Sequence, residues 1–321
     1  MTLDIFFQAL GNLEVLVFRI LPIVVLGIIL GNIIYELGLI DKISVLSAPI
    51  IKFANLPKES GLTLVTMIAS PAASYSMLSN FYEREILDEK QTVVTTFTNT
   101  FFAYFRHVFT FYLPVVIPIL GLKTGLIYIF VRIIISLFST LFGMAVGHFY
   151  LNLEDSSLEF EDIGENRSNG TIKQKIIEGF KKSKPTLRKI VPRLTLVYVL
   201  VAFALVLDLF EPIGRLADPI TTLIGLPGEA STVIIARFAN VTASFVLAGN
   251  LLNSGILGSY EVIATLLIGS LFSLFTHFLK TSLPNKIAYF GTNLGIKVAL
   301  YNWVISTSFI LIITFFLYFL M

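Results

Sequence analysis

Residues 67–78, MIASPAASYSML, place one proline and three serines inside an otherwise apolar segment. A second interruption of the same kind, RFANVTASFVLA, covers residues 237–248. Proline ends a helix because its ring removes a backbone donor, whereas serine, threonine and asparagine cap the start of the next helix. Each stretch therefore predicts a helix that stops and restarts within hydrophobic surroundings.

The composition is that of a polytopic membrane protein. Of the 321 residues, 55% are hydrophobic and 14% are charged, and the mean hydropathy is +0.84. Soluble domains carry about one quarter charged residues, so this class is excluded. Runs near or above the roughly 20 apolar residues that cross a bilayer predict spanning helices, since lipid offers no partner for unpaired backbone groups. These runs cover residues 14–36, 92–120, 124–150, 188–210, 260–280 and 295–320.

Several function classes lack their signatures. The chain has no cysteine, which excludes disulfides and thiolate chemistry. It also has no Walker, HExxH, GxSxG or GxGxxG sequence, and no nucleophile and base can be assembled from its motifs. We therefore expect no enzyme, no cofactor and no nucleic-acid partner.

An internal repeat appears at an offset of 170 residues without a gap. The coinciding residues are prolines, glycines, an asparagine and a histidine, which fix backbone geometry or carry chemistry. They include Pro22 and Pro192, Pro57 and Pro227, Asn80 and Asn250, His107 and His277, Pro114 and Pro284, and Gly121 and Gly291. This agreement predicts a duplicated structure.

The repeat divides the chain into residues 1–150, a polar connector at 151–187, and residues 188–321. Each half predicts a spanning helix, a short amphipathic helix along the membrane surface, the interrupted segment, and two more spans. The apolar faces of the amphipathic helices are Ile43, Leu46, Ile50 and Phe53, and Ile213, Leu216, Ile220 and Leu223. Glycines with GxxxG spacing, Gly27 with Gly31 and Gly143 with Gly147, predict close helix packing or self-association.

Two topologies compete, and the distribution of basic residues chooses between them. If each interrupted segment enters the membrane and returns on the same side, the halves are inverted repeats with three spans each. The connector and most lysines and arginines are then cytoplasmic, and both termini lie outside. If the segments cross, the residues that move outside are Lys42, Lys52, Lys58, Lys280, Lys286 and Lys297. The positive-inside rule favours two re-entrant helical hairpins.

This order of elements, with LPKESGLTLVTMIASPAASYSML and LPGEASTVIIARFANVTASFVLA as the two hairpins, resembles the nucleoside-recognition, or Gate, family. The resemblance covers about residues 14–320 and is to the transport core of concentrative nucleoside transporters and to the membrane domain of bacterial ferrous iron permeases. It implies Gate-like repeats, a small-molecule or ion substrate, and homo-oligomers. The acids and glutamines associated with nucleoside and sodium binding in that family are absent from the hairpin tips here.

Polar hairpin residues are the first candidates for binding a solute: Ser70, Ser74, Ser76, Asn80, Asn240, Thr242, Ser244 and Asn250. Helix ends at membrane depth persist only when they are buried in protein or face water, and discontinuous helices carry the central site of inverted-repeat transporters. The alternative is helix capping and interhelical hydrogen bonding with no solute.

The span that follows the first hairpin is unusually polar, with Asn99 among Thr95, Thr96, Thr98 and Thr100. These side chains contact either the substrate or neighbouring helices. His107 and His277 occupy equivalent positions and could bind a metal ion or solute, relay a proton, or make ordinary hydrogen bonds at a helix crossing. Arg106 and Arg237 lie at membrane depth, where they could attract an anionic solute or bond backbone carbonyls.

We therefore expect a multi-pass cell-membrane transporter of a small polar solute or ion, nucleoside-like or anionic. It would work by alternating access around the two hairpins. The alternatives are a divalent metal permease, suggested by the iron-permease resemblance and the histidine pair, and a membrane scaffold that transports nothing.

Overall fold

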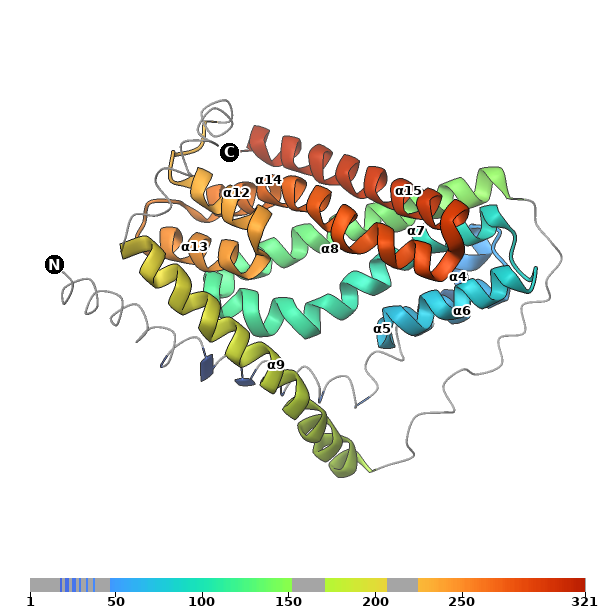
Figure 1. Cartoon of the computed structure of the whole chain (residues 1–321), viewed down its shortest axis with the longest axis horizontal. Coiled ribbons are helices and arrows are strands. Elements are labelled where there is room, and N and C mark those ends of the chain that lie inside the picture. Colours follow the sequence, from blue (N-terminus) through green and yellow to red (C-terminus); the bar gives the residue numbers. More distant parts are fainter. Residues whose placement is uncertain are drawn as a thin grey trace.

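The computed structural model describes residues 47–151, 171–206 and 225–320, with isolated positions between 18 and 37. Within these ranges the regular elements are helices, and no strand occurs (Figure 1). They are α4 (Ser47–Phe53), α5 (Lys58–Ala69), α6 (Pro71–Glu83), α7 (Glu89–His107), η2 (Val108–Val116), α8 (Ile117–Tyr150), α9 (Ile172–Val206), α12 (Ala230–Ala239), α13 (Val241–Asn253), α14 (Ser259–His277), η4 (Phe278–Ser282) and α15 (Leu283–Leu320). The prediction of an all-helical chain is confirmed.

Some predicted features lie outside the described residues. They are most of the first span, residues 152–170 of the connector, the second amphipathic helix, and the part of the first before Ser47.

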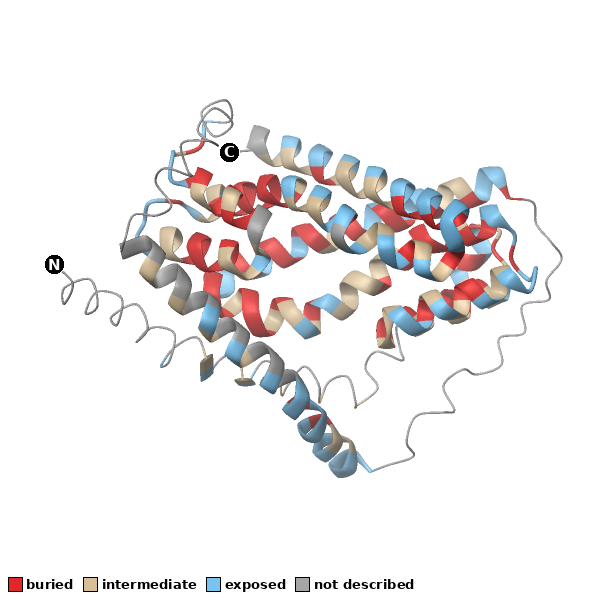
Figure 2. Ribbon diagram, in the orientation of Figure 1, coloured by how far each residue is buried: buried red, intermediate tan, exposed pale blue. Residues whose placement is uncertain are grey.

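Three helical stretches in the described part of the chain are long and apolar enough to cross a membrane: Glu89–Tyr150, Ser259–His277 and Leu283–Leu317. The first stretch consists of two helices, because Gly121 between them has non-helical backbone angles (φ 76°, ψ 166°). Large apolar side chains such as Phe130 and Phe315 are exposed on the outer helices, and Figure 2 shows exposed positions along α15. Apolar side chains left outside the protein core are those expected to face lipid. The chain is a membrane protein.

Both predicted helix breaks are present. α5 ends at Ala69 and α6 begins at Pro71, with Ser70 between them in an extended conformation (φ −154°, ψ 110°). α12 and α13 are likewise separated by Asn240 alone (φ −154°, ψ 123°). One extended residue is enough to end one helix and cap the next.

The helices recur in the second half at the spacing seen in the sequence. α6 and α13 begin and end 170 residues apart, and so do α7 and α14. The two glycine breaks, Gly121 and Gly291, have φ values of 76° and 73°, a region that only glycine enters easily. The matched glycines therefore occupy matched places in the chain's geometry.

Each pair of short helices forms a helical hairpin, because the two helices pack against each other. The first hairpin (α5–α6) lies at the right-hand end of the molecule in Figure 1, and the second hairpin (α12–α13) lies at the left-hand end. α5 also packs on α7, and α12 packs on α14. Since short connections follow the hairpins, α7 and α14 begin at opposite ends of the long axis.

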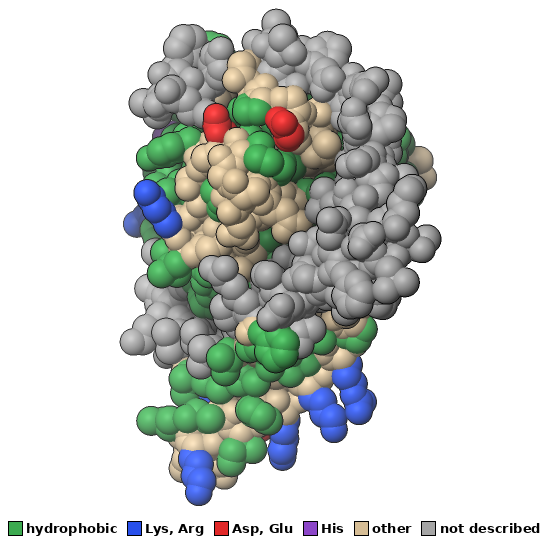
Figure 3. Space-filling model, turned by 90° about the vertical axis from the view of Figure 1, so that its left-hand side faces the viewer, with side chains coloured by type: hydrophobic (Ala, Val, Ile, Leu, Met, Phe, Trp, Pro, Cys, Tyr) green, Lys and Arg blue, Asp and Glu red, His purple; other side chains and the backbone are tan. Residues whose placement is uncertain are grey.

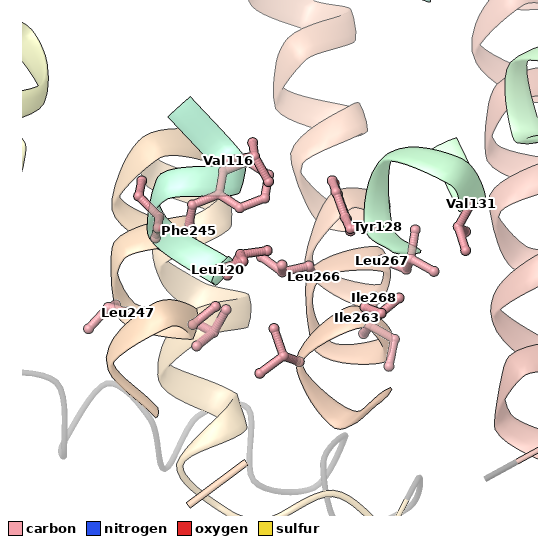
Figure 4. Packing of buried hydrophobic residues seen from close by; sticks show 14 of the residues in the cluster. Val116, Leu120, Tyr128, Val131, Phe245, Leu247, Ile263, Leu266, Leu267 and Ile268 are labelled. Carbon is pink, nitrogen blue, oxygen red and sulfur yellow. The ribbon is translucent and has the colours of Figure 1, made fainter. Parts of the chain in front are cut away.

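The largest apolar cluster joins the two halves. Val116 and Leu120 from the first half meet Phe245 of α13 and Leu266 of α14, and all four are nearly or completely buried (Figure 4). Burying such side chains stabilises by about 1.5–3 kcal/mol each. This core fixes the second hairpin against η2 and α8.

Gly143 and Gly147 serve packing within the chain. A methyl group on Gly143 would lie 2.7 Å from Phe97 Cβ, and one on Gly147 would overlap the Ala54 carbonyl. Of the two uses predicted for this glycine pair, the structure supplies close packing against α7 and the end of α4. Gly27 and Gly31 lie outside the described residues.

α9 begins at Ile172, inside the segment predicted to be a polar connector. Its first half carries exposed lysines, and Figure 3 shows several Lys and Arg side chains at the projecting lower end of the molecule. The connector's basic part is therefore helical and continuous with the following apolar segment.

Candidate functional site

The two hairpin tips are capped by side chains. Ser70 Oγ accepts a hydrogen bond from the Ala73 N–H at 3.2 Å. Asn240 Oδ1 accepts from the N–H groups of Thr242 at 2.8 Å and Ala243 at 3.1 Å. Both capping residues are half-buried, so each tip combines a restarted helix with a polar side chain that is not fully enclosed.

The matched serines behind the tips are completely buried but have different partners. Ser74 Oγ donates to the Thr63 carbonyl at 2.8 Å and so joins the two helices of the first hairpin. Ser244 Oγ donates to the Val241 carbonyl at 2.7 Å and accepts from Arg237 Nη1 at 3.2 Å. Both serine hydroxyls donate to a backbone carbonyl, and that of Ser244 also accepts from a cation.

Arg237 is enclosed by the second hairpin and α8, with only 6% of its surface exposed. Its Nη2 donates to the Tyr128 hydroxyl at 3.3 Å, and its Cζ lies 4.8 Å from the centre of the Phe245 ring. Its Nε is buried without a hydrogen-bond partner. A methyl group on Gly269 would lie 3.0 Å from Arg237 Cβ, so this glycine of α14 leaves room for the side chain.

Arg132, on α8, is buried in a similar way. Its Nη2 donates to the Tyr104 hydroxyl at 2.5 Å, and its Cζ lies 5.1 Å from the centre of that ring. Its Nε and Nη1 are buried without partners, and the whole side chain is 6% exposed. Tyr128 precedes Arg132 by one helical turn, which places both on the same face of α8.

A third buried basic side chain packs against the first hairpin. Lys286 of α15 is 6% exposed, and its Nζ lies 2.9 Å from the centre of the Tyr75 ring on α6. Tyr75 follows Ser74, just as Phe245 follows Ser244, so equivalent aromatic rings of the two hairpins each carry a cation. The Lys286 ammonium has no hydrogen-bond partner among the described residues.

These three cations have no buried acidic counterpart. In the described part of the chain Arg132, Arg237 and Lys286 are the buried charged side chains, and no aspartate or glutamate is buried. Hydroxyl groups and aromatic faces stabilise a cation but do not neutralise it. α12 ends close to Arg237, and its carbonyl end carries a partial charge of about −0.5, which offsets only part of one positive charge. Because a guanidinium keeps its proton when it is buried, the interior is electropositive where Arg132 and Arg237 lie, beside the second hairpin.

Other sequence candidates are placed away from the hairpin tips. Ser76 and Asn80 are exposed on α6, and Asn250 is half-buried in the last turn of α13. Thr242 is half-buried, and its backbone N–H serves the Asn240 cap. In α6 and α13, the candidate polar residues beyond the first turn therefore do not lie at the helix breaks.

The two matched histidines are exposed, and each immediately precedes a π-helical segment, η2 or η4. π-helical turns are rare and occur frequently at functional sites. His107 lies within electrostatic range of His277 and Arg132. Arg106 is half-buried beside His107. No cluster of three histidine, aspartate or glutamate side chains suited to a metal ion occurs among the described residues.

The threonines of α7 form hydrogen bonds within and between helices. Thr95 Oγ1 donates to Ser60 Oγ at 2.9 Å, and Thr96 Oγ1 accepts from Asn302 Nδ2 at 3.0 Å. Asn99 differs, because it is 1% exposed and neither its amide nitrogen nor its oxygen has a partner in the described structure. Of this polar span, Asn99 is the residue with hydrogen-bonding capacity to spare.

The chain is similar along most of its length to two archaeal proteins. It is 33% identical to the uncharacterized protein MJ0880 of Methanocaldococcus jannaschii, over 88% of this chain and 90% of that protein, and 30% identical to MJ0871 of the same organism over 90% and 89%. The Gate family model, described as nucleoside recognition, matches residues 17–123. The chain belongs to the Gate family. The matched range contains the whole first hairpin and α7.

The Gate family is associated with transporters rather than enzymes. A shorter similarity, 27% identity over 23% of this Gate chain and 48% of the relative, links it to the inner membrane protein YjiG of Escherichia coli. No solved structure matches the chain. These similarities agree with a membrane transport protein.

Sequence reasoning did not select Arg132, Tyr128, Tyr75, Phe245 or Lys286 as site residues. A signal was present for the first two, because a tyrosine and an arginine four residues apart share one face of a helix. The aromatic residues after Ser74 and Ser244 also occupy matched positions. Lys286 gave no such signal, since it follows a proline near a predicted span end and was counted with the cytoplasmic lysines.

Proposed function

We propose that this chain is a membrane transporter that works by alternating access around its two hairpins. In this proposal the halves are inverted repeats, and each hairpin is re-entrant, entering from one side of the bilayer and returning to it. The observation that carries the proposal is the pair of helix breaks at Ser70 and Asn240, which share φ −154° and lie in a chain of long apolar helices.

The physical support is the cost of an open helix end in lipid. Unpaired backbone groups cost several kcal/mol each in hydrocarbon, so broken helices at membrane depth occur where protein or a water-filled cavity surrounds them. Inverted-repeat transporters place such breaks at the solute site near the membrane centre. Two capped breaks, one in each hairpin, fit that arrangement.

The proposed orientation follows from the basic residues. We place the connector and the lysine-bearing start of α9 in the cytoplasm and both termini outside, because positive charge is enriched on the cytoplasmic side. The first hairpin then opens to the cytoplasm and the second to the outside.

The proposed substrate is a small polar solute, and the buried cations favour an anionic one. Arg237 lies directly behind the tip of the second hairpin and reaches Ser244, with no buried acid in the described interior to neutralise it. A solute that brings negative charge would offset the desolvation of this guanidinium.

Uptake into proteoliposomes tests the transport proposal. Ser74→Trp and Ser244→Trp place a bulky side chain at completely buried positions behind the two tips, and each is expected to abolish uptake of radiolabelled solutes from a panel of nucleosides and organic anions. Ser76→Trp is the matched control, because Ser76 is exposed on the same helix as Ser74 and its substitution should leave uptake unchanged.

Gel filtration in detergent establishes which variants fold. If a tryptophan variant aggregates, the milder Ser244→Val, which removes the hydroxyl that holds Arg237, takes its place. Normal uptake by folded variants at both positions would contradict the proposed site.

A further inference from the structure

Two buried arginines flank a group of tyrosines between the second hairpin and the segments α7, η2 and α8. We define the arginine–tyrosine cluster as Tyr104, Tyr112, Tyr128, Arg132 and Arg237. Tyr104 is on α7, Tyr112 on η2, Tyr128 and Arg132 on α8, and Arg237 on α12. Residues from four segments of both halves thus meet at one place.

Hydrogen bonds and ring contacts connect the cluster from end to end. Arg237 donates to the Tyr128 hydroxyl at 3.3 Å, and the Tyr128 and Tyr112 rings lie edge to face with centres 6.1 Å apart. Arg132 donates to the Tyr104 hydroxyl at 2.5 Å. His107, which is exposed, lies with its ring centre 6.3 Å from those of both Tyr104 and Tyr112. The cluster therefore reaches from the buried second hairpin to the protein surface.

The guanidinium groups are incompletely satisfied. Arg132 Nε and Nη1 and Arg237 Nε are buried without hydrogen-bond partners. The groups around each arginine are neutral: the hydroxyls of Tyr104 and Tyr112 lie next to Arg132, and those of Tyr128 and Ser244 accept from Arg237. The three donor nitrogen atoms therefore have no charged acceptor.

We propose that the arginine–tyrosine cluster binds a small dianion with charged oxygen atoms, a dicarboxylate or a phosphate-like group, which is the transported solute. That the dianion is transported rests on the proposed function. Its binding to the cluster does not depend on transport. Two buried cations without a buried acid require two negative charges for neutrality, and the interaction is strong where water is excluded.

The chemistry of the cluster selects oxygen anions. A planar guanidinium presents parallel donors that match two oxygen atoms of a carboxylate or phosphate, and this geometry gives a halide no advantage. The hydroxyls of Tyr104 and Tyr128 now accept from the arginines, and they can instead donate to the solute once it takes over the guanidinium donors.

Binding is tested on purified protein in a neutral detergent, with no membrane and no transport. Thermal unfolding is followed at constant ionic strength while chloride is replaced by succinate, phosphate or sulfate, with acetate as the monoanion. At least one dianion is expected to raise the unfolding temperature with a saturating dependence on concentration, and chloride and acetate are not. Vesicles of anionic lipid form a separate arm, and stabilisation by these vesicles alone would overturn the proposal of a soluble solute.

Variants assign the site. Arg237→Gln and Arg132→Gln are each expected to weaken dianion binding by roughly tenfold or more, since each removes charge-assisted hydrogen bonds. Tyr128→Phe, which keeps the buried ring, should fold and weaken binding less. Lys297→Met is the control, because it removes an exposed cation outside the cluster and should leave the response to dianions intact.

Two results would overturn the inference: no dianion effect in the unmodified protein, or an equal effect in the unmodified protein and both arginine variants. Failure of transport is distinguishable from failure of this inference. Dianion binding without uptake would support the binding site and contradict the transport proposal. Uptake of an uncharged nucleoside without dianion binding would support transport and contradict the binding site.

Discussion

Replacing Lys286 with methionine is expected to make the protein more stable. The Lys286 ammonium is buried, lies 2.9 Å from the centre of the Tyr75 ring, and has no hydrogen-bond partner in the described structure. Removing a charge from water costs several kcal/mol, whereas a desolvated cation–π contact returns about 2 kcal/mol. Methionine has a similar length and fills the same space without the charge.

The expected gain is about 1–4 kcal/mol, by analogy with the range found when buried ion pairs are replaced by well-packed apolar residues. At about 2–4 °C per kcal/mol, the midpoint of thermal unfolding should rise by at least about 2 °C. Trp303, the single tryptophan of the chain, lies on α15 with Lys286 and contacts the Phe278 ring, so its fluorescence in detergent reports unfolding of this region.

Lys297→Met is the matched control for this experiment. Lys297 is on the same helix but is exposed and pairs with Glu89 at 2.6 Å, where both side chains are nearly half exposed. Removing an exposed ion pair should change stability little. If Lys286→Met instead lowers the midpoint by as much as an ordinary loss of core packing, the ammonium is favourable where it lies and the reasoning from desolvation is refuted.

Two further predictions concern the backbone. Asn240→Ala removes two capping bonds and should lower the free energy of unfolding by about 1–2 kcal/mol, whereas Ser70→Ala removes one longer bond and should cost about 0.5–1 kcal/mol; equal losses in thermal unfolding would count against the caps. Gly147→Ala should cost about 1–3 kcal/mol because its methyl group would overlap Ala54, and Gly121→Ala about 1 kcal/mol because of its positive φ alone. An unchanged midpoint in the Gly147 variant would show that this packing is wrong.

The sequence predicted the helix breaks well because they depend on local chemistry. Ser70 before Pro71 and Asn240 before Thr242 are cap signals that act within one turn, and the structure places both caps at these residues. The same holds for Gly121 and Gly291, whose conformation requires glycine. Residues that fix the backbone can be recognised without tertiary information.

The cations and their partners were harder to predict because their meaning depends on packing. Arg132 and Arg237 are far apart in sequence, and only the fold brings them to the two sides of one tyrosine group. Lys286 has the sequence environment of a loop residue, but in the fold α15 places its ammonium against the Tyr75 ring. The start of α9 was also missed as a helix, because its exposed charges obscure an apolar face that continues into the next segment.

The central claim, that both hairpins are re-entrant and enter from opposite sides, is tested most directly by labelling single cysteines from each side of a sealed membrane. The chain has no cysteine of its own, and Lys58, Arg84, Glu229 and Ser254 are exposed residues that flank the two hairpins. The account predicts that cysteines at Lys58 and Arg84 react with an impermeant reagent from one side, and those at Glu229 and Ser254 from the other. Reaction of the two members of either pair from different sides would mean that the hairpin crosses the bilayer, and the account would be wrong.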